Sequence, residues 1–190
     1  VINTYFGRPD IPVGAVRGEA PDRSTWHKEP RWTEELPKRY PHRIKTTADS
    51  EDALALYRRI LSEQPDQSVT IVTVGFFSNL QNLLRSQPDR ISPLSGRELV
   101  QKKVKQLVSM AGAFPEGREF NVYVDVKAAQ FVVAEWPTPI LFSGFEIGSQ
   151  VLTGKKLAES GIQGNPIVDA YTMCLQQDNP AGRESWDQTA

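Results

Sequence analysis

Hydrophobic and polar positions follow two different periods along the chain. Between Ser50 and Glu63 the apolar residues recur at helical spacing, which predicts a helix with Asp49 or Ser50 as its N-cap and an end at Pro65. The segment Ser68–Val74 is a β-branched run of strand length between turn residues. Its nearly continuous apolar character is typical of a strand that is covered on both faces, as in a parallel sheet.

The alternation of helical and strand patterns continues to the end of the chain. Ser95 and Glu98 have the spacing of a capping box at a helix start, and Asp125 precedes a helical pattern that ends before Pro137. Further strands are predicted at 107–111 and 139–142, and further helices at 80–85, 151–158 and 168–176. We therefore predict an α/β fold with an open, mainly parallel sheet flanked by helices. Such sheets bind ligands beyond the carboxyl ends of their strands.

The segment before the first helix has a different character. Residues 7–48 are rich in Pro, Arg, Asp and Trp without a sustained period, which predicts a long loop or lid region after a short strand near Ile11–Val13. Both ends of the chain have the pattern of an interrupted element. We expect one domain over residues 1–190 that is incomplete at both ends.

Composition excludes several classes of function. The chain is 39% hydrophobic and 24% charged, which is typical of globular domains. Its 22 Lys and Arg balance 23 Asp and Glu, so it lacks the basic excess of proteins that bind nucleic acid or anionic membranes. The single cysteine, Cys174, excludes an internal disulfide framework. The single cysteine and the lack of a visible signal segment together favour a cytoplasmic location for the protein.

Glu119 and Asn121 follow the predicted strand at 107–111. In extended backbone, residues two apart point to the same side, so this carboxylate and this amide would share one side while Phe120 faces the core. An acceptor beside a group that both donates and accepts suits the neighbouring hydroxyls of a sugar. The alternative is a solvated polar loop.

Two other positions offer oxygen ligands for a cation. The main-chain carbonyl of Val74 lies where a predicted strand ends, and such a carbonyl can coordinate a hard cation. The alternative is an ordinary strand end. Asp187 lies before or at a predicted helix start, where a carboxylate serves as an N-cap or as a metal ligand.

Four segments occur in the order found in one known family: Tyr5–Val13, then Ser68–Val74 running into Gly75–Leu80, then Met110–Phe114 with Glu119–Asn121 and Asp125–Ala129, and finally Trp186–Asp187. On these segments, which span nearly the whole chain, the sequence resembles the inosine–uridine-preferring nucleoside hydrolases (nucleoside N-ribohydrolases).

The resemblance implies a fold and a reaction. The fold is an open, mostly parallel α/β sheet, and the reaction is hydrolysis of the N-glycosidic bond of ribonucleosides to ribose and free base, as in purine and pyrimidine salvage. The family uses a water held by Ca²⁺, with an Asp of an N-terminal cluster as general base. Its members are commonly homodimers or homotetramers. The expected partner is therefore a small nucleoside.

The resemblance also implies roles for individual residues. The Val74 carbonyl and the Asp187 carboxylate match calcium ligands. Glu119 and Asn121 match contacts to the ribose hydroxyls, and Met110 lies where the family has a sugar-site residue. Trp186 stands where members carry a histidine that assists the leaving base. An indole stacks on a nucleobase but is no general acid at neutral pH.

One family motif is absent. No segment matches the Asp-x-Asp-x-Gly-x-Asp-Asp pattern, so the general base is unknown and we expect the chain to hold Ca²⁺ poorly. His27 and His42 are candidates for approaching the base, with surface or structural roles as the alternative. A rival interpretation is a non-catalytic domain on the same scaffold that binds a nucleoside, a sugar or calcium. A third is a different α/β domain with chance similarity.

Overall fold

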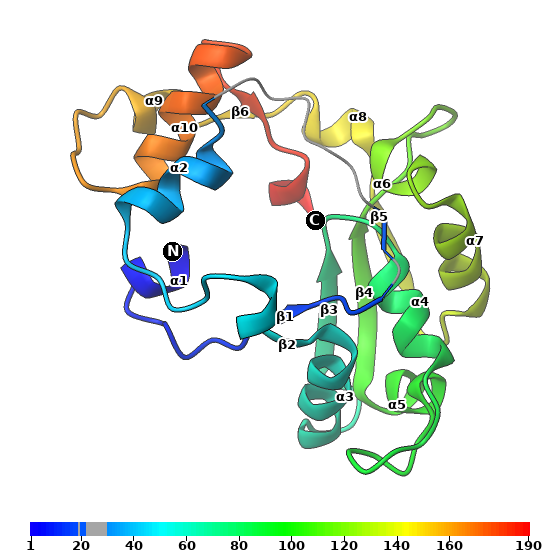
Figure 1. Cartoon of the computed structure of the whole chain (residues 1–190). Helices are drawn as coiled ribbons and strands as arrows, with labels where there is room; N and C mark the ends of the chain where they lie inside the picture. The colour runs from blue at the N-terminus through cyan, green and yellow to red at the C-terminus, as the bar shows by residue number, and fades with distance from the viewer. Residues whose placement is uncertain (19, 22–29) are drawn as a thin grey trace. The chain divides into compact units, whose positions relative to one another are not determined.

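The computed structural model describes residues 1–18, 20–21 and 30–190 (Figure 1). The chain divides into two compact units. Unit 1 comprises Val1–Pro12, Arg23–Asp49 and Ser149–Ser185. Unit 2 comprises Val13–Asp22, Ser50–Gly148 and Trp186–Ala190. The single domain expected over residues 1–190 stays a prediction.

The main sheet lies in unit 2 and is parallel. It has three strands in the order β3-β4-β5, with bounds β3 Val69–Thr73, β4 Val104–Met110 and β5 Ile140–Ser143. The register aligns Val72 with Val108 and Val108 with Leu141. Two short strands, β1 Gly14–Ala15 and β2 Glu51–Asp52, form a second parallel pair. The predicted α/β class with a mainly parallel, open sheet is confirmed.

Helices cover one face of this sheet (Figure 1). They are α3 Ala53–Glu63, α4 Ser78–Arg85, α5 Gly96–Lys103 and α7 Val126–Glu135. Their apolar sides pack on the same sheet face to form the core, whose fully buried members include Leu80, Leu83, Leu99, Val100, Leu107 and Val132. Shorter elements of unit 2 are α6 Phe120–Tyr123, α8 Phe145–Gly148 and η2 Asp187–Thr189.

The opposite face of the sheet is open in part. Val72 on β3 is 53% exposed and Leu141 on β5 is 61% exposed, although both are apolar. The prediction that the strand at 68–74 is covered on both faces is therefore wrong for the structure described here. A run of apolar residues shows that a strand can be buried, but neighbouring elements decide which face is covered.

Helix caps largely follow the local sequence signals. Ser95 and Glu98 form the predicted capping box of α5, and the Asp125 side chain accepts the Ala128 N–H at the start of α7. The cap of α3 differs from the prediction: it is Asp52, whose side chain accepts the Ala55 N–H at 2.9 Å. Residues 51–52 are held in the β1–β2 pair, so the helix begins later than its apolar spacing indicates.

A buried arginine fixes the loop between α4 and α5. Arg58 on α3 is 1% exposed, and its guanidinium donates two hydrogen bonds to the Asp89 carboxylate, at 2.9 and 3.0 Å. It also donates to Ser86 Oγ and to the carbonyls of Ser92 and Leu94. Every contact uses the planar fork of donors that distinguishes arginine from lysine.

Unit 1 is built around helix α10, Pro166–Gln177, which confirms the predicted helix at 168–176. Its other elements are α1 Ile2–Tyr5, α2 Trp32–Arg39, η1 Thr47–Asp49, β6 Leu152–Thr153, α9 Lys155–Ala158 and β7 Arg183–Glu184. The Tyr40 hydroxyl, just after α2, donates to Asp169 on α10 at 2.9 Å.

Two predictions of local structure in unit 1 are wrong. Residues 151–158 form no continuous helix, because Gly154 has φ +91° and the Tyr171 ring occupies the space where a Cβ would lie. Helix α2 lies inside the predicted loop 7–48. The sequence gives little helical signal there, because Leu36 is the only buried residue of α2 and Pro37 lies within the helix.

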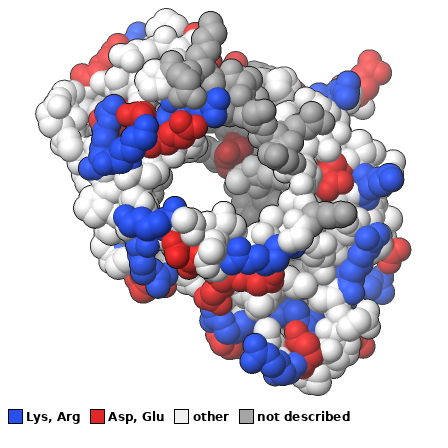
Figure 2. Space-filling view, viewed as in Figure 1, with Lys and Arg blue, Asp and Glu red and all other residues white. Residues whose placement is uncertain are grey.

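Charge is mixed on the surface. Figure 2 shows Lys and Arg interspersed with Asp and Glu on the face in view, in keeping with the balanced composition. In the part of the chain that the structure describes, no helix combines the length and the apolar character needed to span a membrane.

Candidate functional site

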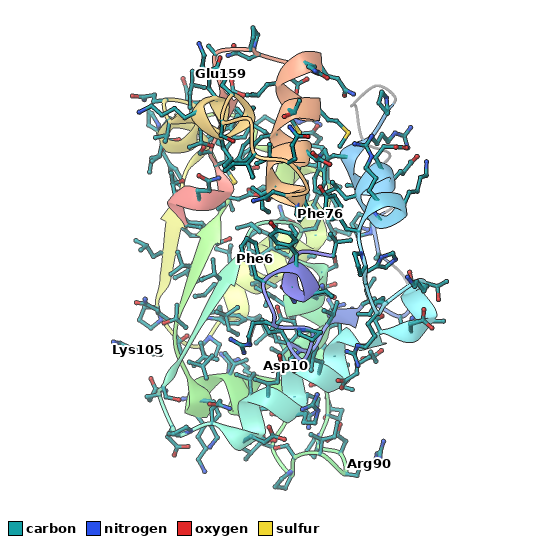
Figure 3. The ribbon with its side chains drawn as sticks, turned by 90° about the vertical axis from the view of Figure 1, so that its left-hand side faces the viewer. Phe6, Asp10, Phe76, Arg90, Lys105 and Glu159 are labelled. Atoms are coloured by element: carbon teal, nitrogen blue, oxygen red, sulfur yellow. The ribbon has the colours of Figure 1, made fainter. Side chains whose placement is uncertain are left out.

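The carboxyl edge of the unit 2 sheet collects most of the predicted site residues. Val74 follows β3, Met110 ends β4, and Glu119 and Asn121 follow β4. Arg90 and Lys105 lie toward the other end of the sheet, whereas Phe76 lies beyond the end of β3 (Figure 3). This is the edge at which open parallel sheets bind ligands.

The C-terminal residues also reach this edge. The hydroxyls of Ser143, the last residue of β5, and Thr189 share a hydrogen bond of 2.8 Å. Thr189 Oγ1 also donates to the Trp186 carbonyl. These bonds attach the segment that carries Trp186 and Asp187 to the end of β5.

Glu119 is buried and its carboxylate binds backbone N–H groups. The side chain is 5% exposed and caps helix α6. Oε1 accepts the Asn121 N–H at 2.8 Å, while Oε2 accepts the N–H groups of Val122 and Gly112, both at 3.1 Å. Three charge-assisted hydrogen bonds offset the cost of burying the carboxylate.

Asn121 connects α6 to the end of β4. Its Nδ2 donates to the Met110 carbonyl at 3.0 Å and lies 3.3 Å from the Met110 sulfur. The side chain is 8% exposed, and its Oδ1 accepts no hydrogen bond from any residue that the structure describes. The predicted pair Glu119 and Asn121 therefore forms one cluster with Met110, and Asn121 Oδ1 remains as an acceptor in it.

The predicted orientation of Phe120 is wrong. Glu119 is extended but Asn121 lies in the helix, so the period of two does not apply. The capping bonds turn the two polar side chains inward, which also excludes a solvated loop. Phe120 remains half-buried, with its ring centroid 5.6 Å from those of Phe76 and Tyr123.

Trp186 is packed against helix α8. Its ring stacks on Phe145 with centroids 5.3 Å apart and an interplanar angle of 26°. Its Nε1–H donates to the Phe145 carbonyl at 3.1 Å. A Cβ added at Gly148 would lie 2.3 Å from the Trp186 Cα, so only glycine fits there without a shift. Neither Phe145 nor Gly148 is indicated by the sequence, because no motif or periodic pattern marks these two positions.

The two predicted calcium ligands do not by themselves form a calcium site. Val74 lies beyond β3 and Asp187 is exposed at the start of η2. Across the described ranges, no group of three or more His, Cys, Asp or Glu side chains is arranged to hold a metal. Calcium takes six to eight oxygen ligands, and these two residues supply a carbonyl and a carboxylate. The described donor set therefore does not fit a complete site.

Both ring nitrogens of His42, in unit 1, lie close to polar groups of neighbouring residues. Its Nδ1 lies 2.9 Å from the Tyr40 carbonyl, and its Nε2 lies 3.3 Å from Lys45 Nζ. A neutral ring that donates through Nδ1 and accepts through Nε2 satisfies both contacts. The other candidate histidine, His27, lies outside the described residues.

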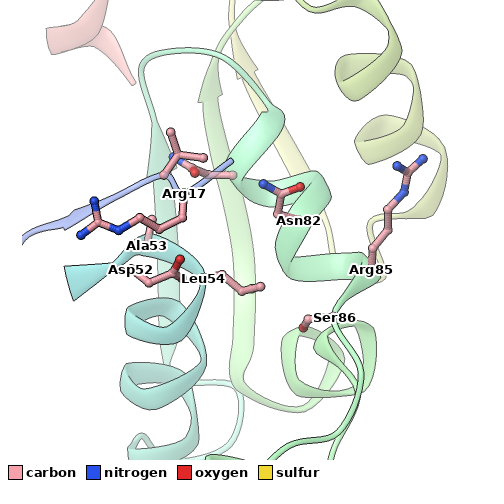
Figure 4. A pocket seen from close by; sticks show the side chains of 9 residues that line it. Arg17, Asp52, Ala53, Leu54, Asn82, Arg85 and Ser86 are labelled. Atoms are coloured by element: carbon pink, nitrogen blue, oxygen red, sulfur yellow. The ribbon is translucent and has the colours of Figure 1, made fainter. Parts of the chain in front are cut away.

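A cavity of about 380 Å³ lies elsewhere in unit 2, between the start of α3 and helix α4 (Figure 4). Its lining includes Arg17 and Arg85, but neither guanidinium points into it. Arg17 donates to the Ser50 carbonyl at 2.8 Å, and Arg85 lies 4.4 Å over the Phe131 ring. The cavity therefore lacks the converging charges of an anion site.

Comparison with known proteins identifies related sequences. The family described as inosine-uridine preferring nucleoside hydrolase matches residues 2–186. An uncharacterised protein of Schizosaccharomyces pombe is 31% identical over 179 residues, which is 87% of this chain and 53% of that protein. The inosine-uridine preferring nucleoside hydrolase of Leishmania major is 25% identical over 154 residues, 74% of this chain and 45% of that enzyme.

A third relative is named for a pyrimidine substrate. The pyrimidine-specific ribonucleoside hydrolase of Salmonella arizonae is 33% identical over 100 residues, 50% of this chain and 28% of that enzyme. The chain thus spans about half, or less, of the length of these curated relatives.

Proposed function

The chain belongs to the inosine-uridine preferring nucleoside hydrolase family, and from this premise we propose that it carries the ribose-binding part of an enzyme that hydrolyses the N-glycosidic bond of ribonucleosides. The products would be ribose and the free base. The observation that carries the proposal is the cluster of Glu119, Asn121 and Met110 at the carboxyl edge of the sheet.

The cluster supports recognition of a sugar through hydroxyl groups. The Glu119 carboxylate binds three backbone N–H groups, but a carboxylate has about four lone-pair sites, so it can accept one hydroxyl more. Asn121 Oδ1 is a second acceptor. Cleavage of a glycosidic bond passes through an oxocarbenium-like state, and hydrogen bonds to sugar hydroxyls that strengthen there accelerate the reaction.

No step of the reaction is assigned to calcium. The described residues provide Val74 and Asp187 as two candidate ligands, which is too few for a site. We propose these two as this chain's contribution to a calcium site in the whole protein. The general base stays unassigned. Assembly as a homodimer or homotetramer and a cytoplasmic location also stay predictions.

A non-catalytic role is the second candidate. It is favoured by one observation: the polar groups of Glu119 and Asn121 already hold the backbone of α6 and the end of β4 together. These contacts serve the fold whether or not the protein is an enzyme. They are therefore also consistent with a domain that binds a nucleoside or sugar without cleaving it.

The test is ribose release by the full-length protein. It would be incubated with inosine, uridine and p-nitrophenyl riboside, with and without Ca²⁺. Reducing sugar would be quantified together with the free base or, for the last substrate, with p-nitrophenol. We expect equal amounts of both products, and we expect Asn121→Ala to lower kcat/KM at least tenfold because it removes an acceptor. The matched control is Gln130→Ala, which removes an exposed carboxamide on α7. Binding of inosine without any product would favour the non-catalytic role instead.

A further inference from the structure

We propose that the exposed ring of Phe145, backed by Trp186, is the surface on which the nucleobase stacks and the residue that favours purine over pyrimidine nucleosides. This inference rests on the proposed function. It differs from the expectation for Trp186, because the ring that contacts the base is now Phe145 and Trp186 is a positioning residue.

The geometry of the pair supports a rigid apolar platform. The two rings are stacked, with centroids 5.3 Å apart, and Phe145 remains 44% exposed while Trp186 is half-buried. The Trp186 ring is fixed by its bond to the Phe145 carbonyl. Its backbone lies against Gly148. The ring available to a planar ligand is therefore that of Phe145, held in place from behind.

Gly112 connects this platform to the sugar cluster. The Gly112 N–H donates to Glu119 Oε2 at 3.1 Å, and the Gly112 carbonyl accepts the Phe145 N–H at 2.8 Å. The Glu119 side chain and the Phe145 backbone thus bind the N–H and the carbonyl of a single residue, two positions beyond β4. A nucleoside whose ribose contacts Glu119 would have its base within reach of the Phe145 ring.

The side chains of Phe145 and Trp186 would contact the face of a nucleobase and offer it no hydrogen bond. The Trp186 N–H is already used by the Phe145 carbonyl, and phenylalanine has no polar group. Stacking tolerates any base, because every base has a π face, and its strength rises with the stacked area. The two-ring purines therefore gain more from Phe145 than the one-ring pyrimidines.

The experiment compares Phe145→Leu with the wild type in the full-length protein. Leucine keeps apolar bulk but has no ring face. We expect kcat/KM for inosine to fall about tenfold to a hundredfold, mainly through KM, and kcat/KM for uridine to fall less. Phe145→Trp should restore the preference. The matched control is Phe131→Leu, the same change on α7, which should leave the inosine-to-uridine ratio unchanged.

Two outcomes would overturn the inference. One is an unchanged inosine-to-uridine ratio in folded Phe145→Leu. The other is an equal loss on both nucleosides together with a lower Tm, since that pattern indicates a purely structural ring. A wild type that releases no ribose rejects the proposed function separately. In that case, binding of hypoxanthine to the wild type and to Phe145→Leu would be measured by calorimetry. Weaker binding by Phe145→Leu supports the platform. No binding by the wild type, or the same Kd for both proteins, rejects it.

Discussion

The Glu119 carboxylate accepts the backbone N–H of Asn121 at 2.8 Å, so the first of the two sugar-site candidates holds the backbone of the second. The same carboxylate also binds the N–H of Gly112, two residues beyond the end of β4. The cluster is therefore one hydrogen-bonded unit, and a change at Glu119 is expected to reach Asn121.

Glu119→Gln tests this coupling. The amide keeps one oxygen acceptor but turns an NH₂ group toward backbone donors, so we expect a loss of about 1–2 kcal/mol in the free energy of unfolding. Ribose release should fall further than this loss explains. Urea unfolding and kcat/KM would measure the two effects. Glu116→Gln, an exposed glutamate nearby, is the control, and equal behaviour of the two variants would contradict the coupling.

Arg58→Leu is expected to be the most damaging change far from the site. It removes the donor for Asp89, Ser86 and two main-chain carbonyls while leucine still fits an apolar space. We expect a loss of about 3 kcal/mol or more, because buried acceptors are left without partners. Chemical denaturation would measure it. Arg59→Leu, the next residue, is exposed and should change stability little. Similar losses in both would reject the role of Arg58.

Stability should depend on pH through Asp89. Hydrogen bonds from the Arg58 guanidinium, then from the Ser92 and Ile91 N–H groups, lower the pKa of its carboxyl from 3.8 to about 2. Because the folded pKa is the lower one, the stabilisation is present above the unfolded pKa and is lost as pH falls through the folded pKa. The difference in unfolding free energy between wild type and Asp89→Asn should therefore shrink between about pH 4 and pH 2. A difference that is constant across this window would contradict the prediction.

Gly148→Ala should disturb the Trp186–Phe145 pair. Its Cβ would lie 2.3 Å from the Trp186 Cα, so the backbone of Trp186 must move. We expect a loss of about 1–3 kcal/mol, as for other overpacked positions, together with a changed near-ultraviolet circular dichroism signal. Gly75→Ala is the matched control, since a Cβ there meets nothing within 4 Å. An unaltered spectrum in Gly148→Ala would show that the pair tolerates the shift.

Calcium affinity tests the incomplete donor set. With one carbonyl and one carboxylate proposed as ligands, we expect the 190-residue chain to bind Ca²⁺ with a Kd of roughly 1 mM or weaker. Isothermal titration calorimetry would measure it, with Asp187→Asn as the comparison. Micromolar binding that Asp187→Asn leaves intact would mean that other residues of this chain form the site.

Elements with strong local signals could be predicted from the sequence. The capping box of Ser95 and Glu98 and the Asp125 cap depend on residues three apart, so they appear in the structure as predicted. Where distant elements intervene, the predictions failed. Pairing with β1 delays the start of α3 to Ala53, and the Tyr171 ring packs against Gly154 where a continuous helix was expected.

The site shows the same division. Glu119, Asn121 and Met110 could be selected from the sequence, but their joint arrangement could not. The sequence pattern predicts an extended backbone here, whereas the Glu119 side chain caps a helix and lies inward together with that of Asn121. The partnership of Phe145 and Trp186 spans 41 residues and leaves no periodic pattern.

By itself, the sequence determined the α/β class, the parallel strands and the residue types gathered near their carboxyl ends, because apolar periodicity and short-range caps act between near neighbours. Only the tertiary structure decided which sheet face is covered, which polar groups are already bonded to backbone, and that Phe145 rather than Trp186 presents the exposed ring. These features depend on contacts between residues far apart in the chain, and folding alone brings such residues together.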